Sequence, residues 1–429
     1  MISRCVKMVV WGLLVLSAWP SAARAGRTFH VDPKLGKMTN EGSSARPWST
    51  LEEVVAAGKI RSKDANGKVV NPAGAVRPGD TILLRTGYHG DVSISGAYND
   101  AVITVAAGKD QRPTLKRLRL CRARKWTFRG LTVTPSVGPK YEQTTLVSLG
   151  LRRKTPCSEL VIENSFIYSV QDSSKWSKAD WVSKACNGIS LGREGKGLIA
   201  RGNYLLNVRF GINLAAPGST AEGNTIENFS GDGIRAMVDD LTVQYNTIMN
   251  CYKVDKNHDD GIQCFLFNKG RGTVRRATVR GNIIINRQDP NQPHQGALQG
   301  IGFFDGPLID FLVEKNVVLT AHWHGVSLYD AQNCKILNNA VYTRWTSEKP
   351  RPWIMLGQKQ GLTKNNTVKG NIAHRFNLPK SGVDTADNHE VTEEAFYKRM
   401  KELTAFINKK YGPVHPVSNR PRIGKHVQK

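Results

Sequence analysis

The sequence is poor in cysteine, in acidic residues and in long apolar runs. It has seven Cys in 429 residues, and none stands in a Cys-x-x-Cys or Cys/His spacing typical of zinc sites. Beyond residue 25 no segment approaches the ~18 continuous apolar residues that a membrane-spanning helix requires. Asp and Glu number 35 against 61 Lys and Arg, which gives a net charge of +26. We therefore expect neither a zinc site nor a transmembrane span in the mature chain.

The first 25 residues are typical of an export signal. Arg4 and Lys7 form a basic start, the run MVVWGLLVLSAW (8–19) is apolar, and ARA before Gly26 fits cleavage after about Ala25. An uncleaved N-terminal anchor is the alternative. We predict a signal peptide over 1–25 and a periplasmic or secreted protein.

The excess of positive charge indicates a polyanionic partner. Removal of the basic residues Arg4, Lys7 and Arg24 with the signal leaves a charge of +23. Outside the cytoplasm, such a charge more often meets acidic polysaccharides or anionic surfaces than nucleic acid. We therefore expect an acidic polysaccharide substrate, no nucleic acid, and a monomeric protein.

Six cysteines follow the predicted signal, and two states are open for them. They are Cys121, Cys157, Cys186, Cys251, Cys264 and Cys334. An even number in an oxidising compartment permits disulfides, and Cys251 and Cys264 could then staple the loop between them. Buried free thiols are the alternative, because the chain is long enough to build a core without staples.

A short phrase recurs from about Leu160, an Asn followed by alternating apolar residues. It begins at Asn164, Asn203, Asn224, Asn246, Asn282, Asn316, Asn339 and Asn371, and the shortest intervals are 21, 22 and 23 residues. Brief β-rich runs at a short period indicate a parallel β-solenoid, in which each coil buries its face against the next. An Asn at one fixed turn position is expected there, because its amide can hydrogen-bond the same residue of the next coil.

A second phrase, one residue followed by Gly-Ile or Gly-Val, starts another strand in each coil. The residues before these glycines form a predicted column of Asn187, Phe210, Asp232, Asp260, Gln299 and His324. Strands of neighbouring coils lie ~4.8 Å apart, so Asp232 and Asp260 should be near neighbours, with Arg235 and Gln263 beside them. The long insertions all fall at the same corner of the coil, where solenoids usually build their binding surface.

Three N-terminal stretches carry a family resemblance. FHVDPKLGKMTNEGSSARPWSTLEEVV, VRPGDTILLRTGYHGDVSIS and PTLKRLRLCRARKWTFRGLTVT closely resemble the opening of bacterial proteins of the pectin-lyase-like superfamily. The resemblance covers about residues 28–375. It implies an all-β fold, a right-handed parallel β-helix, behind a capping helix at about 49–57. The superfamily holds lyases, hydrolases, epimerases and spikes, so the resemblance implies the fold rather than one activity.

Two further motifs resemble those of polygalacturonases within that superfamily. DDGIQ (259–263) and HGVSL (324–328) look like their paired-aspartate and His-Gly motifs, and the DGI step at 232–234 resembles their upstream Asp-Gly step. No clear Arg-x-Lys clamp follows HGVSL, and the interval between the two motifs is long. The match is therefore incomplete.

β-Elimination at a uronic acid is the reaction that we expect first. It needs a group that neutralises the C6 carboxylate, a base for the C5 proton and an acid for the leaving oxygen. Arg235 and Lys256 are candidates for neutralisation, and His258, His294 or His324 for the base. Epimerisation at C5 begins with the same proton abstraction and stays an alternative.

The acidic residues have two alternative uses. Asp232, Asp259 and Asp260 could hold a Ca²⁺ that neutralises the substrate carboxylate, because hard cations collect carboxylate oxygens. They could instead supply the two carboxylates that glycoside hydrolysis needs, since Asp232 and Asp260 belong to adjacent coils. A polygalacturonase-like hydrolase is therefore the second hypothesis, and a non-catalytic glycan-binding or adhesive solenoid is the third.

The predicted site gathers these residues at one corner of the solenoid. The predicted catalytic residues are Asp232, His258, Asp259, Asp260 and His324. The predicted substrate-binding residues are Arg235, Lys256, Gln263, His294, Gln299, His322 and Trp323, where the indole would stack on a sugar ring.

The C-terminal stretch EVTEEAFYKRMKELTAFINKKYG (390–412) has apolar residues at helical spacing, early acids, late lysines and a closing Gly. It predicts an amphipathic helix that packs on the solenoid or covers its open end; a membrane-surface helix is the alternative. We place the β-helix domain at 26–380 and the C-terminal helix with its basic tail at 381–429.

Overall fold

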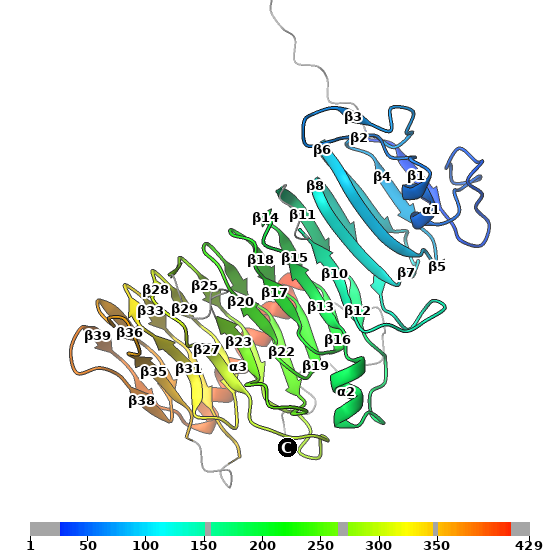
Figure 1. The fold of residues 1–429 in the computed structure, drawn as a ribbon. Coiled ribbons are helices and arrows are strands. Elements are labelled where there is room, and N and C mark those ends of the chain that lie inside the picture. Colours follow the sequence, from blue (N-terminus) through cyan, green and yellow to red (C-terminus); the bar gives the residue numbers. More distant parts are fainter. Residues whose placement is uncertain (1–25, 151–155, 265–272, 346–350, 413–429) are drawn as a thin grey trace, which may run out of the picture.

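The computed structural model describes residues 26–150, 156–264, 273–345 and 351–412. Within them the chain winds into a solenoid of parallel strands whose coils stack along one axis (Figure 1). The predicted fold class, an all-β right-handed parallel β-helix, is confirmed. The predicted signal over 1–25 and the end of the basic tail, 413–429, lie outside the described residues.

Each coil contributes strands to three faces. The face that carries the site is called the cleft sheet, and its strands after the first coils are β10 (Thr145–Leu149), β13 (Asn187–Leu191), β17 (Ile212–Leu214), β20 (Ile234–Ala236), β23 (Asp260–Cys264), β27 (Gln299–Phe303), β31 (His324–Tyr329), β35 (Trp353–Gly357) and β38 (Arg375–Asn377). The long strands β6 (Asp91–Ala107) and β8 (Arg117–Arg129) run from this sheet around a corner into the next face.

The next face, the second sheet, consists of β1 (Thr28–Val31), β4 (Thr81–Leu84), β11 (Cys157–Glu163), β15 (Ile199–Arg201), β18 (Thr220–Glu222), β21 (Thr242–Gln244), β25 (Thr278–Arg280), β29 (Leu312–Glu314), β33 (Lys335–Leu337), β36 (Asn366–Lys369) and β39 (Val383–Ala386), with the ends of β6 and β8. The third sheet consists of β5 (Gly87–Tyr88), β7 (Pro113–Leu115), β9 (Thr132–Val133), β12 (Phe166–Tyr168), β16 (Tyr204–Val208), β19 (Thr225–Phe229), β22 (Thr247–Cys251), β26 (Ile283–Ile285), β30 (Val317–Leu319), β34 (Ala340–Tyr342), β37 (Ile372–Ala373) and β40 (His389–Glu390). Short strands outside these faces are β2 (Ser62–Lys63), β3 (Val69–Val70), β14 (Gly195–Lys196), β24 (Val274–Arg275), β28 (Leu308–Ile309) and β32 (Ala331–Gln332).

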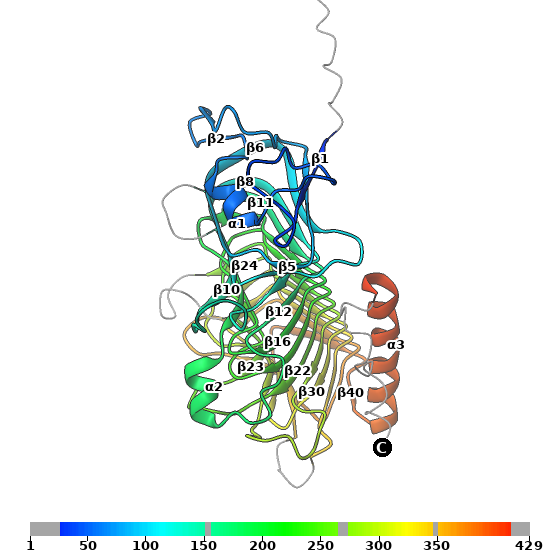
Figure 2. The same cartoon turned by 90° about the vertical axis from the view of Figure 1, so that its right-hand side faces the viewer.

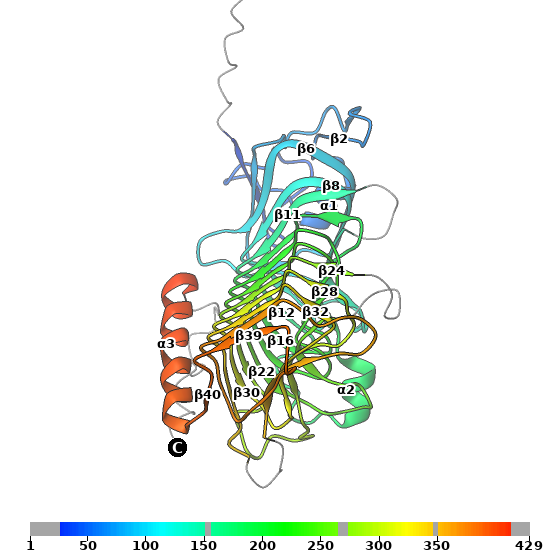
Figure 3. The same ribbon diagram turned by 90° about the vertical axis from the view of Figure 1, so that its left-hand side faces the viewer.

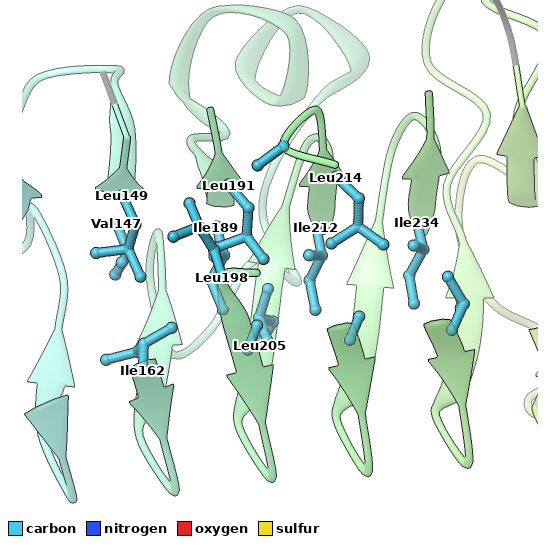
Figure 4. Packing of buried hydrophobic residues seen from close by; sticks show 14 of the residues in the cluster. Val147, Leu149, Ile162, Ile189, Leu191, Leu198, Leu205, Ile212, Leu214 and Ile234 are labelled. Atoms are coloured by element: carbon cyan, nitrogen blue, oxygen red, sulfur yellow. The ribbon is translucent and has the colours of Figure 1, made fainter. Parts of the chain in front are cut away.

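The interior is a stack of aliphatic side chains in register. Ile189 pairs with Ile212, and Ile212 pairs with Ile234, so the three side chains form one buried row (Figure 4). Burial of each such side chain contributes roughly 1.5–3 kcal/mol. The alternation of apolar and polar residues along each strand therefore decides which face of every coil points inward.

A ladder of asparagines runs along one corner, as the repeat predicts. In each rung the Oδ1 of one Asn accepts from both the backbone N and the Nδ2 of the Asn one coil earlier; Asn224 Oδ1, for example, lies 3.0 and 2.9 Å from these atoms of Asn203. One predicted member was wrong. Ser165 takes the ladder position, because its backbone N donates to Asn203 Oδ1, whereas Asn164 stands one residue earlier with a left-handed φ of 49°.

The N-terminal coil is closed by the predicted capping helix. It is α1 (Leu51–Ala56), which begins after Thr50, whose side chain accepts from the backbone N of Glu53. Leu51 and Val54 are buried, and the helix packs against β6. The helix α2 (Lys178–Lys184) lies in the first long insertion and begins with a capping box formed by Ser177 and Asp180.

The C-terminal helix α3 (Glu393–Tyr411) packs on the flank of the solenoid. It runs along the outer face of the third sheet over β26, β30 and β34, and Figures 2 and 3 show it beside the stack from opposite sides. Phe396 and Met400 are its buried residues. Of the two predicted positions, the flank is therefore the one observed. The solenoid also continues past residue 380, since β39 and β40 still pair and Asn388 extends the ladder.

The six cysteines after residue 25 are all buried free thiols. The alternative of free thiols therefore holds, and the predicted staple between Cys251 and Cys264 is not formed, because both side chains point into the packed interior of their coils. Within the described residues, no helix has the length and apolar character needed to cross a membrane.

Candidate active site

A cleft of about 710 Å³ lies on the cleft sheet over β23, β27 and β31. Seven residues predicted from the sequence line it: His258, Asp259, Gln263, Gln299, His322, Trp323 and His324. Further lining residues that the sequence did not single out are Lys253, Asn257, Ala297, Phe304, Tyr329 and Lys359. The predicted corner of the solenoid therefore contains a real cavity.

The predicted column of residues is formed by the strand register. Asp260 is the register partner of Gln299, and Gly233 N donates to the backbone oxygen of Asp260 at 2.8 Å. The Gly step allows this close stacking. A Cβ added at Gly261 would lie 2.6 Å from Ile284 Cγ2 and 2.8 Å from the backbone oxygen of Gly300.

Asp232 is buried in the coil before Asp260 and is neutralised within the protein. Its side chain is 1% exposed, and its Oδ2 accepts from Arg235 Nε at 2.5 Å. The Arg235 guanidinium also lies 3.5 Å from the ring centroid of Phe210. Burial raises the pKa of Asp232, and Arg235 opposes that rise. Arg235 therefore forms an ion pair with Asp232 and does not line the cleft.

Asp260 lies behind the cleft wall. It is fully buried, and its Oδ2 accepts from Gln263 Nε2 at 2.9 Å. Burial, together with the neighbouring Asp232 and Asp259, raises the pKa of Asp260 well above its usual value. Gly302 leaves room for this carboxyl group, since an added Cβ there would lie 2.4 Å from Asp260 Oδ1 and 2.3 Å from Phe304 Cε2. Asp260 therefore holds its proton more strongly than an ordinary carboxyl group does, and it lies outside the cleft.

Asp259 faces the cleft. It is 2% exposed, its Oδ1 accepts from Asn257 Nδ2 at 2.9 Å, and its Oδ2 lies 3.2 Å from Lys253 Nζ. Burial raises the pKa of Asp259 to about 6, while Asn257 and Lys253 oppose the rise. A carboxyl group with such a pKa exchanges a proton near neutral pH, as a general acid or base must.

Two cleft histidines are held in distinct hydrogen-bonding states. The backbone N of His324 donates to His322 Nδ1 at 3.0 Å, so neutral His322 carries its proton on Nε2. His324 Nδ1 lies 2.8 Å from Ser327 Oγ, and Trp353 Nε1 lies 3.2 Å from the same oxygen and 3.3 Å from Nδ1. Burial lowers the pKa of both histidines to about 4, and His324 and His258 add to the effect on His322.

Five of the twelve predicted site residues lie outside the cleft lining: Asp232 and Asp260, described above, and Arg235, Lys256 and His294. Arg235 pairs with Asp232 as described, and Lys256 is exposed on the loop before Asn257. His294 instead holds the wall formed by the insertions, since its Nε2 lies 2.9 Å from the backbone oxygen of Trp176 and its ring packs edge-on to Tyr252.

The three aspartates do not fit a calcium site in this arrangement. In the described residues, no three acidic, histidine or cysteine side chains are grouped so that they could hold a metal. Asp232 is paired with Arg235, Asp259 with Lys253, and Asp260 accepts from Gln263. The calcium hypothesis is untested, and chelation is the measurement that tests it.

The cleft residues that the sequence did not single out come from the insertions and strand ends. Lys253 stands four residues before Asn257, whose backbone oxygen accepts from Lys253 Nζ. Lys359 reaches the cleft from the end of β35, where Nζ lies 3.3 Å from the backbone oxygen of Phe304. Neither lysine belongs to a repeated phrase, so only the three-dimensional arrangement identifies it.

Comparison with known proteins finds similarity to solved structures but not to sequence families. No protein-family model and no curated protein matches the sequence. A solved structure described as a glycoside hydrolase has a TM-score of 0.52 at 10% identity and covers 87% of this chain and 98% of its own. Pectate lyase Pel9A has a TM-score of 0.49 at 13% identity, covering 85% and 80%, and a rhamnogalacturonan lyase has 0.40 at 11%, covering 86% and 90%. At 10% identity the likeness to the glycoside hydrolase shows the fold alone, a parallel β-helix.

Proposed function

We propose that the protein is an exported carbohydrate-active enzyme that cleaves an acidic, uronic-acid-containing polysaccharide by β-elimination in this cleft. The carrying observation is that Asp259, of the three predicted aspartates, is the one that lines the cleft. Hydrolysis needs two carboxyl groups at the scissile bond, whereas elimination needs one acid, one base and a cation beside the substrate carboxylate.

The cleft supplies candidates for each of these roles. Lys253 and Lys359 are the cations at its wall and can neutralise a C6 carboxylate. Asp259, protonated below its pKa of about 6, can give a proton to the leaving oxygen. Phe304, Tyr329 and Trp323 offer aromatic surface on which sugar rings stack.

His324 is the proposed base. The role requires the tautomer with the proton on Nδ1, donated to Ser327 Oγ, which leaves Nε2 free to accept the C5 proton. A bound uronate would place a negative charge beside the ring and raise its lowered pKa towards neutrality. His322 carries its proton on Nε2 and is therefore a hydrogen-bond donor to substrate.

The test is incubation with polygalacturonate, alginate, glucuronan and glycosaminoglycans, followed by both ultraviolet absorbance of unsaturated sugars and new reducing ends. Elimination predicts that both signals rise together. Asp259→Asn and His324→Gln should each lower kcat by about 10²–10⁴-fold, whereas the exposed controls Asp384→Asn and His389→Gln should keep full activity. Full activity in either site variant would contradict its role.

Hydrolysis is the second candidate, because Asp232 and Asp260 touch across neighbouring coils. New reducing ends without ultraviolet absorbance would favour it. Silence in both signals on every substrate would favour an epimerase or a glycan-binding solenoid.

A further inference from the structure

The column of residues that contains Asp260, Gln299 and His324 continues beyond the cleft. Trp353 is the register partner of His324, and Arg375 is the register partner of Trp353 on the following coil. The rings of His324 and Trp353 meet edge to face at 5.4 Å. The column therefore passes from the proposed base to a tryptophan and then to an arginine.

Trp323 presents an open aromatic face beside this extension. Its side chain is 50% exposed although it lines the cleft, and its ring centroid lies 6.4 Å from that of Trp353. The backbone N of Trp353 donates to the backbone oxygen of Trp323 at 2.9 Å, which fixes the two residues relative to each other. Exposed indole faces of this kind are suited to sugar rings, which have an apolar side of their own.

Arg375 supplies an available positive charge at the end of the column. It is exposed, and its guanidinium carbon lies 5.6 Å from the Trp353 ring centroid. Elsewhere on the solenoid arginines pair with carboxylates, as Arg280 does with Glu314 at 2.5 Å. Among the described residues no carboxylate forms an ion pair with Arg375. Contact with an aromatic ring leaves the N–H donors of a guanidinium able to bind an anion.

We propose that Trp323, Trp353 and Arg375 form a sugar-binding subsite on the C-terminal side of the cleft, and that it takes an acidic sugar residue of the bound polysaccharide. The sugar ring stacks on Trp323, and its carboxylate binds the Arg375 guanidinium by paired charge-assisted hydrogen bonds. Trp353 positions Arg375 through the contact between its ring and the guanidinium group. The inference rests on the proposed function, since it extends the same binding site.

The subsite has a consequence for substrate length. Trp353 and Arg375 lie one and two coils beyond His324, at strand spacings of ~4.8 Å. A ligand that fills only the cleft does not reach Arg375, whereas a longer chain lying along the solenoid axis does. The effect of Arg375 should therefore appear with long acidic oligosaccharides and be absent with short ones.

The experiment measures binding without turnover. In an Asp259→Asn background, isothermal titration calorimetry is performed with the dimer and the hexamer of galacturonate and of mannuronate. Arg375→Gln should weaken hexamer binding by about 10-fold or more, as expected for a hydrogen bond to a charged group, and should leave dimer binding unchanged. Arg375→Lys keeps the charge but loses the planar guanidinium fork. Its affinity for the hexamer should therefore lie between that of the parent protein and that of Arg375→Gln.

Controls separate the possible failures. Arg112→Gln removes an exposed charge from a distant coil and should have no effect. Thermal unfolding of each variant checks that the fold is kept. If Arg375→Gln, like Arg112→Gln, leaves hexamer binding unchanged, the subsite is overturned but the proposed function is not. Failure of both hexamers to bind the parent protein, with cleavage of one of the four polymers intact, would overturn the subsite alone; failure of both binding and cleavage on every polymer would overturn both.

Discussion

The backbone N of Asp260 donates to Oδ1 of Asp232 at 3.1 Å, so two acidic residues of neighbouring coils are joined directly. Both are almost fully buried, yet only Asp232 has a cation beside it, Arg235. The charge of Asp232 also raises the pKa of Asp260, so the two carboxyl groups do not both ionise at low cost. The arrangement therefore favours ionisation of Asp232 over that of Asp260, and leaves Asp259 to face the cleft.

Loss of Arg235 should destabilise the protein. Arg235→Met removes the cation from a buried carboxylate. We expect the free energy of unfolding to fall by about 3 kcal/mol. This is the low end for a broken buried pair, because Arg235 is one-fifth exposed. Urea unfolding measures it. The double variant Asp232→Asn with Arg235→Met should recover much of the loss, since no charge is then left unpaired; equal stability of the single and double variants would contradict the ion-pair argument.

The stability contribution of Asp259 should depend on pH. Its pKa rises from 3.8 to about 6 on folding, so the folded state holds the proton more tightly than the unfolded chain. The favourable contribution is complete below about pH 4 and is lost as the pH rises through 6. Between pH 4 and pH 7 the stability of Asp259→Asn relative to the wild type should therefore increase by about 2–2.5 kcal/mol. Urea unfolding across this range checks it, and a difference independent of pH would be evidence against the raised pKa.

Chelation should leave activity intact. Asp232 and Asp259 already have cationic partners, so calcium would have to displace Arg235 or Lys253 to bind them. We expect EDTA to change neither the rate of polysaccharide cleavage nor the melting temperature. Loss of activity that added Ca²⁺ restores would instead support the calcium hypothesis and would place the metal where substrate and protein meet.

The asparagine ladder should be a main source of stability. Asn282 Oδ1 accepts from the backbone N and the Nδ2 of Asn246, both at 3.0 Å. Asn282→Ala leaves these two buried donors without their acceptor, and each such group costs about 1–3 kcal/mol. We expect a loss of roughly 3 kcal/mol in urea unfolding. The exposed Asn66→Ala is the matched control, and an equal effect of the two substitutions would argue against the ladder.

The repeated features of the fold were predictable because each is a local pattern with one stable solution. Alternating apolar residues can bury one face only by stacking coils. The Gly before each inward Ile or Val marks a position where an added Cβ would collide with the next coil, as at Gly261. The amphipathic C-terminal stretch likewise predicted α3, although its place on the flank depends on the apolar outer face of the third sheet.

The sequence predicted where the site lies on the solenoid, but not which role each of its residues has. The column before the glycines located Asp232, Asp260 and His324, because register repeats from coil to coil. The single error in the ladder, Asn164 for Ser165, came from two polar residues standing side by side in the sequence. Nothing in the repeat distinguished Asp259, which faces the cleft, from Asp260, which lies behind it.

Hydrophobic burial and strand register, both readable in the sequence, therefore define the solenoid, its axis of repetition and the corner at which polar side chains collect. Tertiary structure alone decided which carboxyl group meets substrate, which cations remain available, and that Lys253, Lys359 and Arg375 lie along one surface. These residues come from insertions and from different coils, and their pKa values and partners depend on distances between segments that no local pattern specifies.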